Sequence, residues 1–326
     1  MTARLVRVTW AVPDERVARL AAAEPELTLV GVDADAPDEA VEALVGWPAG
    51  PPERYPALRW LQVPSAGVDA VDLAAWTARG VTVTNARGVY AVPIAQYVLA
   101  AILAIAEQHR VRTAQQATGE WPTDEAPFVG VSVRGATLAL VGYGGIGREI
   151  ARLAAAHGMR VLAAKARPEL RTDDGYRVPG TGDPDGAIPE SIVGMDELAT
   201  IAREADYLVV TAPLTTVSRG VVSEAVLSAL PPRAWLINIA RGPVADEAAV
   251  LRALDEDRLA GAVLDVFAEE PLPSGHPFWT HPRVIVTPHI AGGPSDDAFE
   301  ALVTDNLARW AAGVQLRNVV DPARGY

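Results

Sequence analysis

The chain contains no cysteine. Disulfides, thiolate metal ligands and cysteine nucleophiles are therefore excluded. Lysine is almost missing as well, because Lys165 is the only lysine among the 28 basic residues.

The chain also has few basic residues, 28 against 41 acidic residues, which gives a formal net charge of −13. Nucleic-acid binding needs clustered positive charge, so no nucleic-acid partner is expected. A small anionic substrate remains compatible with this balance, because local charges decide its binding.

Long uninterrupted apolar runs are missing too. The N-terminus lacks the apolar core and the cleavage site of a signal peptide. The most apolar stretch, Val89 to Ala106, contains Pro93 and Gln96, which favours a buried helix over a membrane span. We expect a cytoplasmic protein with no membrane partner.

Half of the 326 residues are apolar, which suits one large or two ordinary domains. Short apolar runs alternate with amphipathic helical patterns along the chain. This alternation predicts an α/β protein with parallel sheets in two successive blocks. The predicted strands are 5–12, 27–32, 43–47, 59–63 and 81–86 in the first block, and 137–142, 160–164, 207–212, 234–240, 261–267 and 284–288 in the second.

Two helices and one loop bear on the organisation of the chain. A long helix is predicted from about Ile94 to Ala117, and a last helix from Pro294 to Ala312. Because this last helix follows the second block, it could return to the first domain. Residues 167–195 are rich in Pro, Gly and Asp and are predicted to form a long surface loop, which is functional or mobile.

A Gly-rich turn, VGYGGIG (141–147), follows a predicted strand and opens a predicted helix. Gly142, Gly144 and Gly147 fit the spacing of a dinucleotide-binding turn, which allows a tight turn, close approach of a pyrophosphate and close helix packing. The alternative is a purely structural glycine turn. The strand–turn–helix context favours dinucleotide binding at the helix N-terminus.

The residue that follows the next strand indicates the choice of cofactor. NAD sites carry an acidic residue about 20 positions downstream of the turn. Here Lys165 takes that place and Arg167 follows it. Two cations can pair with a 2′-phosphate, which favours NADP over NAD, although both could be solvated surface charges.

Charged and polar residues stand at the ends of the later strands, where an α/β sheet places its chemistry. His289 lies in VTPHIAGG, a setting that indicates a fixed loop and suits proton transfer. Glu270 could orient the ring and favour its imidazolium form, and Asp265 could serve the carboxamide of the cofactor or the histidine. A structural or metal-binding histidine is the alternative, but no metal site is expected.

Arg241 closes the run NIARG. A guanidinium fork matches a substrate carboxylate in two parallel hydrogen bonds. The alternative is a surface or phosphate-binding arginine, but the place of Arg241 at a strand end favours the site. Trp47, Tyr90 and Trp121 could line an apolar substrate pocket or belong to the core.

Together these segments resemble the D-isomer-specific 2-hydroxyacid dehydrogenase family, in particular its glyoxylate/hydroxypyruvate reductases. The resemblance covers nearly the whole chain in the same order. The segments that carry it are SAGVD (65–69), TNARGVYAVPIAQYVLA (84–100), VGYGGIG (141–147), TAPLT (211–215), NIARG (238–242), DVFAEEP (265–271) and TPHIAG (287–292).

The resemblance implies that NAD(P)H reduces a small 2-oxo acid to a D-2-hydroxy acid. It implies Arg241, Glu270 and His289 as the catalytic set, with Arg241 and the amides of Ser65, Ala66 and Gly67 on the substrate carboxylate. It places the following residues at the cofactor, with NADP preferred and NAD possible: Gly142, Tyr143, Gly144, Gly145, Ile146, Gly147, Lys165, Arg167, Thr211, Ala212, Pro213, Ile239, Ala240, Asp265, His289 and Gly292.

It also implies two doubly wound domains. One is a Rossmann cofactor domain, residues 105–289, and the other is a discontinuous flavodoxin-like substrate domain, residues 1–104 and 290–326. The resemblance further implies a homodimer. The chain departs from the family at Gln96, at Lys165 and in the length of 167–195. A dinucleotide-sensing, corepressor-like binding protein is the non-enzymatic alternative. Within the enzymes, Glu270 argues against formate dehydrogenase, and phosphoglycerate dehydrogenase stays open.

Overall fold

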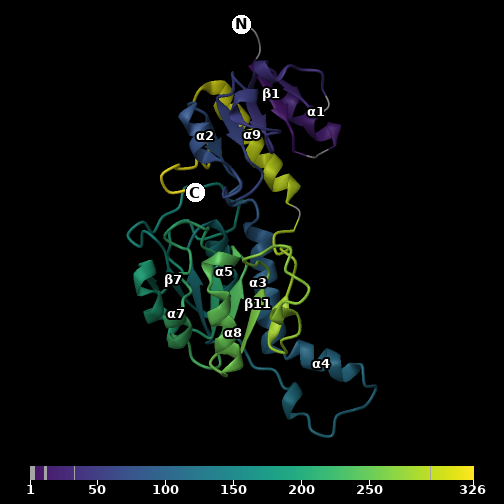
Figure 1. Ribbon diagram of the computed structural model, residues 1–326, viewed down its shortest axis with the longest axis vertical. Helices are drawn as coiled ribbons and strands as arrows, with labels where there is room; N and C mark the ends of the chain where they lie inside the picture. Colours follow the sequence, from purple (N-terminus) through teal and green to yellow (C-terminus); the bar gives the residue numbers. More distant parts are fainter. Residues whose placement is uncertain (1–3, 11–12, 33, 294) are drawn as a thin grey trace. The chain divides into compact units, whose positions relative to one another are not determined.

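The structure, a computed structural model, describes residues 4–10, 13–32, 34–293 and 295–326 (Figure 1). Ala11 and Val12, at the end of the first predicted strand, and Pro294, at the start of the last predicted helix, lie outside the described residues. The chain divides into two compact units. Unit 1 comprises Met1–Tyr90, Gly175–Val178 and Pro294–Tyr326, and unit 2 comprises Ala91–Asp174 and Pro179–Gly293.

Unit 1 contains a five-stranded parallel sheet with the order β2-β1-β3-β4-β5. This is the strand order of flavodoxin-like folds, which confirms the predicted architecture. Its strands are β1 (Arg4–Val8), β2 (Leu27–Val30), β3 (Val41–Val45), β4 (Trp60–Gln62) and β5 (Thr82–Thr84), and its helices are α1 (Asp14–Ala23), α2 (Leu73–Ala78), α9 (Asp296–Ala312) and the short η1 (Asp38–Ala40) and η2 (Pro52–Arg54).

The two faces of this sheet are buried in separate apolar clusters. In β3, Ala43 and Val45 belong to one cluster while Val41 and Leu44 belong to the other. Helix α9 covers the first face with residues spaced three and four apart, as an amphipathic helix does. These are Phe299, Leu302, Val303 and Leu307. The last helix therefore returns to the sheet of the first block.

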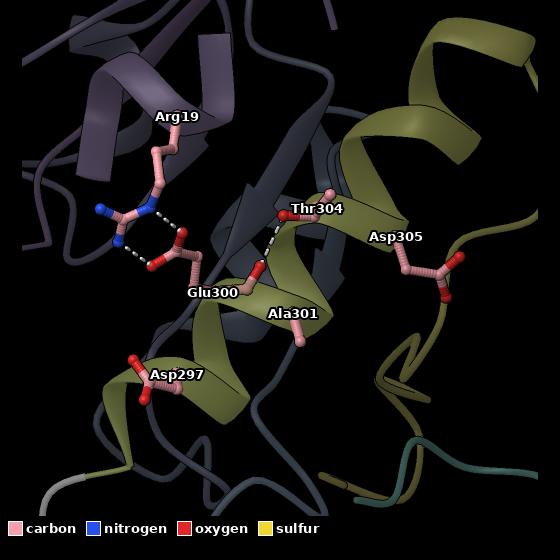
Figure 2. Close-up of a pocket in the computed structure, with 6 residues that line it drawn as sticks. All are labelled: Arg19, Asp297, Glu300, Ala301, Thr304 and Asp305. Carbon is pink, nitrogen blue, oxygen red and sulfur yellow. Dashed lines mark hydrogen bonds and ion pairs between the residues drawn. The ribbon is translucent and has the colours of Figure 1, made fainter. Parts of the chain in front are cut away.

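Helices α1 and α9 are also joined at the surface of unit 1. Figure 2 shows the guanidinium of Arg19 forming a two-pronged ion pair with Glu300, with N···O distances of 2.9 and 2.8 Å. Asp297 and Asp305 complete the acidic rim of the pocket drawn there. None of the residues predicted to bind substrate or cofactor lines this pocket.

Unit 2 contains a seven-stranded parallel sheet with the order β12-β11-β10-β9-β6-β7-β8. The chain runs outward in one direction from β6 to β7 and in the other from β6 to β9. This reversal is the point at which doubly wound sheets bind dinucleotides. The strands are β6 (Thr137–Val141), β7 (Arg160–Ala164), β8 (Ser191–Val193), β9 (Tyr207–Val210), β10 (Trp235–Asn238), β11 (Gly261–Leu264) and β12 (Val284–Val286).

The inner strands of unit 2 are buried except at Arg160 and Trp235, the first residues of β7 and β10, as continuous Val, Ile and Leu runs predict for a sheet covered on both faces. The helices of this unit are α3 (Ala91–Ala106), α4 (His109–Gln116), α5 (Gly145–Ala156), α6 (Leu198–Ala202), α7 (Glu224–Ala229) and α8 (Glu247–Asp255), with the short η3 (Ala126–Phe128), η4 (Met195–Glu197), η5 (Gly242–Val244) and η6 (Pro277–Trp279).

The single long helix predicted from Ile94 to Ala117 is wrong. The structure has α3 and α4, which meet at 64° with Gln108 in a left-handed conformation between them. Six residues of α3 are buried, whereas α4 is polar and buries none of its side chains. In the described part of the chain no single helix meets the length and composition of a membrane span, although this bent pair does when its two helices are taken together.

The division into units differs from the predicted boundaries in three places. Helix α3, predicted to lie mostly in the substrate domain, belongs to unit 2, where it packs on α5. The later crossing falls between Gly293 and Pro294 rather than after residue 289. Within the predicted loop 167–195, Gly175–Val178 belong to unit 1 and Ser191–Val193 form the edge strand β8. Strand β8 has only three residues, which explains why the sequence predicted no strand there.

Candidate active site

The predicted catalytic residues follow three neighbouring strands of unit 2. Asn238 in β10 pairs with Leu264 in β11, and Leu264 pairs with Val286 in β12. Arg241, Glu270 and His289 come three to six residues beyond these positions. Because the strands are parallel, all three residues start from the carboxyl edge of one sheet.

The structure brings Glu270 and His289 into contact. His289 Nδ1 lies 2.8 Å from Glu270 Oε2, and the other oxygen of Glu270 accepts the Phe267 amide at 2.9 Å. A carboxylate only accepts, so Nδ1 carries the proton and donates it. Within the described residues no hydrogen bond involves Nε2, and the half-exposed ring presents this atom for proton transfer.

Asp265 holds the turn on which His289 stands. Asp265 is 1% exposed, and its carboxylate accepts hydrogen bonds from Thr287 Oγ1 at 2.6 Å, from the Ile290 amide at 2.9 Å and from the Ala291 amide at 3.0 Å. Both oxygens are engaged by this turn. Of the two roles left open for Asp265, the structure therefore shows one, the support of the histidine.

Two residues that the sequence analysis missed belong to the same support. The Tyr97 hydroxyl from α3 lies 2.6 Å from Thr287 Oγ1, and burial raises the pKa of Tyr97. Asn238 accepts the Ala240 amide at 3.1 Å and donates to the Arg241 carbonyl at 3.2 Å. Asn238 could have been found as the polar residue in an apolar strand. Tyr97 gives no such signal, because its contact spans 190 residues.

The backbone after Arg241 approaches the segment that carries Glu270. A Cβ atom on Gly242 would lie 1.9 Å from the carbonyl carbon of Phe267, so only glycine fits there. Together with the Asn238 bonds, this close approach fixes the turn from which the Arg241 side chain departs.

The Gly-rich turn has the geometry that its three glycines predict. Gly142 has a φ of 102°, and a Cβ there would lie 2.7 Å from the Ala212 amide nitrogen. A Cβ on Gly147 would lie 2.6 Å from the Gly142 carbonyl oxygen, so α5 packs directly on the strand end. A Cβ on Gly144 would meet no atom within 4 Å. Only this glycine faces open space, where a pyrophosphate would need to approach.

The N-terminus of α5 is suited to that phosphate. It has no side-chain cap, and within the described residues the amides of Gly145, Ile146 and Gly147 donate to no acceptor. Free amides at a helix N-terminus form an anion site. The residues present therefore fit a dinucleotide. The other predicted cofactor residues lie at the same edge, with Thr211, Ala212 and Pro213 after β9, Ile239 and Ala240 after β10, and Gly292 after the His289 turn.

Lys165 stands beside this turn. It directly follows β7, whose last carbonyl, that of Ala164, accepts the Gly142 amide at 2.8 Å. The ammonium of Lys165 donates to the Leu170 carbonyl at 2.6 Å, and Arg167 follows two residues later. Both predicted 2′-phosphate ligands thus lie on the chain that leaves β7.

The 167–195 segment folds back onto the Gly-rich turn through Asp183, which is buried. The Tyr143 hydroxyl donates to Asp183 Oδ2 at 2.5 Å, and the Arg148 guanidinium donates to the carbonyls of Asp183 and Arg171. Burial raises the pKa of the Asp183 carboxyl, but the bond from Tyr143 and the amides of residues 187 and 188 outweigh it and lower the pKa. Burial also raises the pKa of Tyr143 well above its usual range. Within unit 2, the segment is thus an anchored layer on α5.

In unit 1, Ser65, Ala66 and Gly67 form a row of amides with no acceptor among the described residues. The carbonyls of Pro64, Ser65 and Ala66 accept hydrogen bonds from residues 85–90. In a trans peptide the next N–H points opposite to the carbonyl. The three amides therefore point away from residues 85–90 and form a nest suited to an anion.

Among the described residues, no cluster of three or more His, Asp or Glu side chains is arranged to hold a metal ion. Of the three aromatic residues considered for an apolar substrate pocket, two do not belong to the core, because Trp121 is 86% exposed and Trp47 is 43% exposed. The hydroxyl of Tyr90 donates to the Pro64 carbonyl.

Residues 99–291 match the family model described as D-isomer specific 2-hydroxyacid dehydrogenase, NAD binding domain. The chain is 34% identical over 264 residues, 80% of each chain, to the (S)-sulfolactate dehydrogenase of Chromohalobacter salexigens.

Among solved structures, it superposes on a D-isomer specific 2-hydroxyacid dehydrogenase from Xanthobacter autotrophicus in complex with NADPH and MES, with a TM-score of 0.82, 29% identity and 100% coverage of both chains. It also superposes on the NADPH-dependent glyoxylate/hydroxypyruvate reductase of Sinorhizobium meliloti, with a TM-score of 0.78, 27% identity and 99% coverage of both chains.

The named relatives are enzymes, so the oxidoreductase prediction is confirmed over the corepressor-like alternative. The chain belongs to the D-isomer specific 2-hydroxyacid dehydrogenase family, and it is an NAD(P)-dependent oxidoreductase of small 2-hydroxy and 2-oxo acids.

Proposed function

We propose that this protein uses NADPH to reduce a short 2-oxo acid of the glyoxylate and hydroxypyruvate type. The observation that carries the proposal is the Glu270–His289 pair, which presents Nε2 at the sheet edge where Arg241 stands. The printed names of the similar structures, one bound to NADPH and one a glyoxylate/hydroxypyruvate reductase, support the choice of substrate and cofactor.

The reduced nicotinamide, when bound, supplies the hydride. The chain supplies the remaining parts of the reaction. Arg241 and the amides of Ser65, Ala66 and Gly67 bind the carboxylate of the substrate. Arg241 also polarises the 2-oxo carbonyl of the substrate. His289 holds a proton on Nε2 and donates it to the carbonyl oxygen as negative charge develops there. Glu270 orients the ring through Nδ1 and stabilises the imidazolium.

A turnover assay tests this function. The panel comprises glyoxylate, hydroxypyruvate, pyruvate, 3-sulfopyruvate and phosphohydroxypyruvate, each with NADPH and with NADH. We expect measurable reduction of glyoxylate or hydroxypyruvate with NADPH, and a D-configured product from hydroxypyruvate. Dinucleotide binding without turnover on any member of the panel would contradict the proposal.

Cofactor choice gives the first mutational prediction. Lys165→Asp should lower the ratio of kcat/KM with NADPH to that with NADH by tenfold or more, since a hydrogen bond between charged partners contributes about 1.5–3 kcal/mol. The measurement is steady-state kinetics with each cofactor at saturating 2-oxo acid. Arg203→Asp, an exposed change of the same charge at the end of α6, is the control. An unchanged ratio in the Lys165 variant would place that lysine outside the phosphate site.

We further propose a homodimer formed through unit 2. Figure 1 shows α4 and the segment after it extending away from the rest of this unit. The extension exposes a set of large apolar side chains, which usually marks an interaction surface. They are Val111, Trp121, Val129 and Val131.

The mass in solution tests the assembly. By light scattering we expect twice the 34.4 kDa of the chain, and we expect Trp121→Asp to shift the protein towards the monomer. Asp124→Asn, in the same extension, is the control. A wild-type protein that is monomeric at micromolar concentration would contradict the proposal. The cytoplasmic location stays a prediction from the sequence.

A further inference from the structure

Two of the three amides of the nest, those of Ala66 and Gly67, are supported by one turn, residues 85–88, which we call the supporting turn. The Asn85 side chain donates to the Ala66 carbonyl at 3.0 Å, and the Ala86 amide donates to the Ser65 carbonyl at 2.8 Å. These two bonds fix the carbonyls of Ser65 and Ala66, and the planar peptide links then fix the direction of the amides of Ala66 and Gly67. The geometry of the nest therefore depends on the placement of the supporting turn.

The supporting turn is held in its place by Asn318, near the end of the chain. Asn318 Nδ2 donates to the carbonyl of Asn85 at 3.2 Å and to that of Arg87 at 2.8 Å. The Asn85 amide donates back to the Asn318 carbonyl at 3.2 Å. Asn318 itself adopts a left-handed φ of 55°. One carboxamide thus bridges two carbonyls of the turn.

Tyr176, from the part of the 167–195 segment that belongs to unit 1, orients this carboxamide. Its amide donates to Asn318 Oδ1 at 3.0 Å, which leaves Nδ2 directed at the supporting turn. The Tyr176 carbonyl occupies the space beside Gly88, where a Cβ would lie 1.9 Å from its oxygen. Gly88 has a φ of 86°, so both its conformation and its neighbour require glycine.

The ring of Tyr176 anchors this contact. Its hydroxyl donates to the Ala298 carbonyl in α9 at 3.0 Å, and the ring packs against the apolar cluster that contains Val89 and Phe299. Burial raises the pKa of Tyr176, so the phenol stays protonated and can donate at neutral pH. The side chain therefore fixes the position of the peptide group that contacts Asn318.

We propose that Tyr176 is a positioning residue for substrate binding, which acts through Asn318 and Asn85 on the amides that hold the carboxylate. The proposal rests on the function proposed above, because it assumes that these amides bind the 2-oxo acid. It assigns a role to the part of the 167–195 segment that belongs to unit 1.

Two variants interrupt this connection at different points. Tyr176→Ala removes the anchor, and Asn318→Asp keeps an acceptor for the Tyr176 amide but removes both Nδ2 donors. In each variant we expect the KM for glyoxylate and the inhibition constant of oxalate to rise about tenfold, because displacement of a binding group by a fraction of an ångström is costly. We expect kcat at saturation and the Kd of NADPH to stay within about twofold of wild type, since neither property depends on the amide nest.

Two controls accompany them. Tyr176→Phe keeps the ring and loses only the bond to Ala298, so its KM should rise less than that of Tyr176→Ala. Asp185→Ala changes an exposed residue of the same segment in unit 2 and should leave the KM, the inhibition constant and kcat unchanged. Thermal unfolding of every variant identifies a general loss of stability, which would lower activity without separating KM from kcat.

The outcomes separate the two proposals. A wild-type protein without turnover on 2-oxo acids would overturn the proposed function. An active wild type whose KM and oxalate inhibition are unchanged in Asn318→Asp and Tyr176→Ala would overturn this inference alone. If Tyr176→Ala does not fold, Asn318→Asp decides, and an unchanged KM in that variant overturns the inference.

Discussion

Replacing His289 by glutamine should lower kcat by about 10²–10⁴-fold, the usual contribution of a general acid. Glutamine can still donate a hydrogen bond to Glu270, so the turn held by Asp265 should persist. It has no titratable proton to deliver to the substrate oxygen. The Kd of NADPH, measured by fluorescence titration, should therefore stay close to that of wild type while single-turnover hydride transfer slows.

His281→Gln is the matched control for this experiment. His281 lies just before β12, at the opposite end of the strand that leads to His289, and contacts Asp255. The same chemical change there should leave kcat within about twofold of wild type, in keeping with a substitution away from the reacting atoms. Normal turnover of His289→Gln at saturation, with weakened NADPH binding, would mean that His289 serves the cofactor and not the proton.

Replacing Arg241 by alanine should lower kcat/KM for the 2-oxo acid by about 10³-fold. The estimate follows from two charge-assisted hydrogen bonds to a carboxylate, each contributing about 1.5–3 kcal/mol. Arg241→Lys should recover part of the loss, because an ammonium keeps the charge but lacks the planar fork. Steady-state kinetics over a range of substrate concentrations give both constants.

Arg233→Ala provides the comparison for Arg241. Arg233 is exposed, lies just before β10 and pairs with Asp206, so it stands at the opposite edge of the same strand. We expect its substitution to leave kcat/KM unchanged within about twofold, since exposed ion pairs contribute little. A wild-type kcat/KM in Arg241→Ala would remove Arg241 from the substrate site and leave the amide nest as the only proposed ligand of the carboxylate.

The parts of the site that are local in sequence could be predicted. Gly142, Gly144 and Gly147 follow a strand at fixed spacing, and their three different environments match the three reasons for glycine at those positions. Arg241 and His289 follow apolar runs that the sequence identifies as strands. Parallel strands place their carboxyl ends at one edge, so the common origin of these residues follows from the pattern alone.

The parts that depend on distant contacts could not be predicted. Tyr97 reaches Thr287 across 190 residues, and Asn318 contacts Asn85 across 233. Neither Tyr97 nor Asn318 belongs to a sequence pattern that indicates its hydrogen-bond partner. The break between α3 and α4 was missed for a related reason. The sequence pattern gives no sign of a break at Gln108, whereas in the structure that residue is left-handed, α3 packs on α5, and α4 buries none of its side chains.

Unit 1 is assembled from stretches at both ends of the chain and four residues from its middle. The five strands of unit 1 are synthesised first, yet Phe299 and Leu302, which help to cover one face of their sheet, are synthesised only after unit 2. During synthesis that face is covered only in part, by residues of α1 such as Leu20, whereas unit 2 has received all of its residues by Gly293. The order of translation therefore favours completion of the dinucleotide-binding unit first, and part of the earlier-made sheet stays open to chaperones or to aggregation until α9 is synthesised.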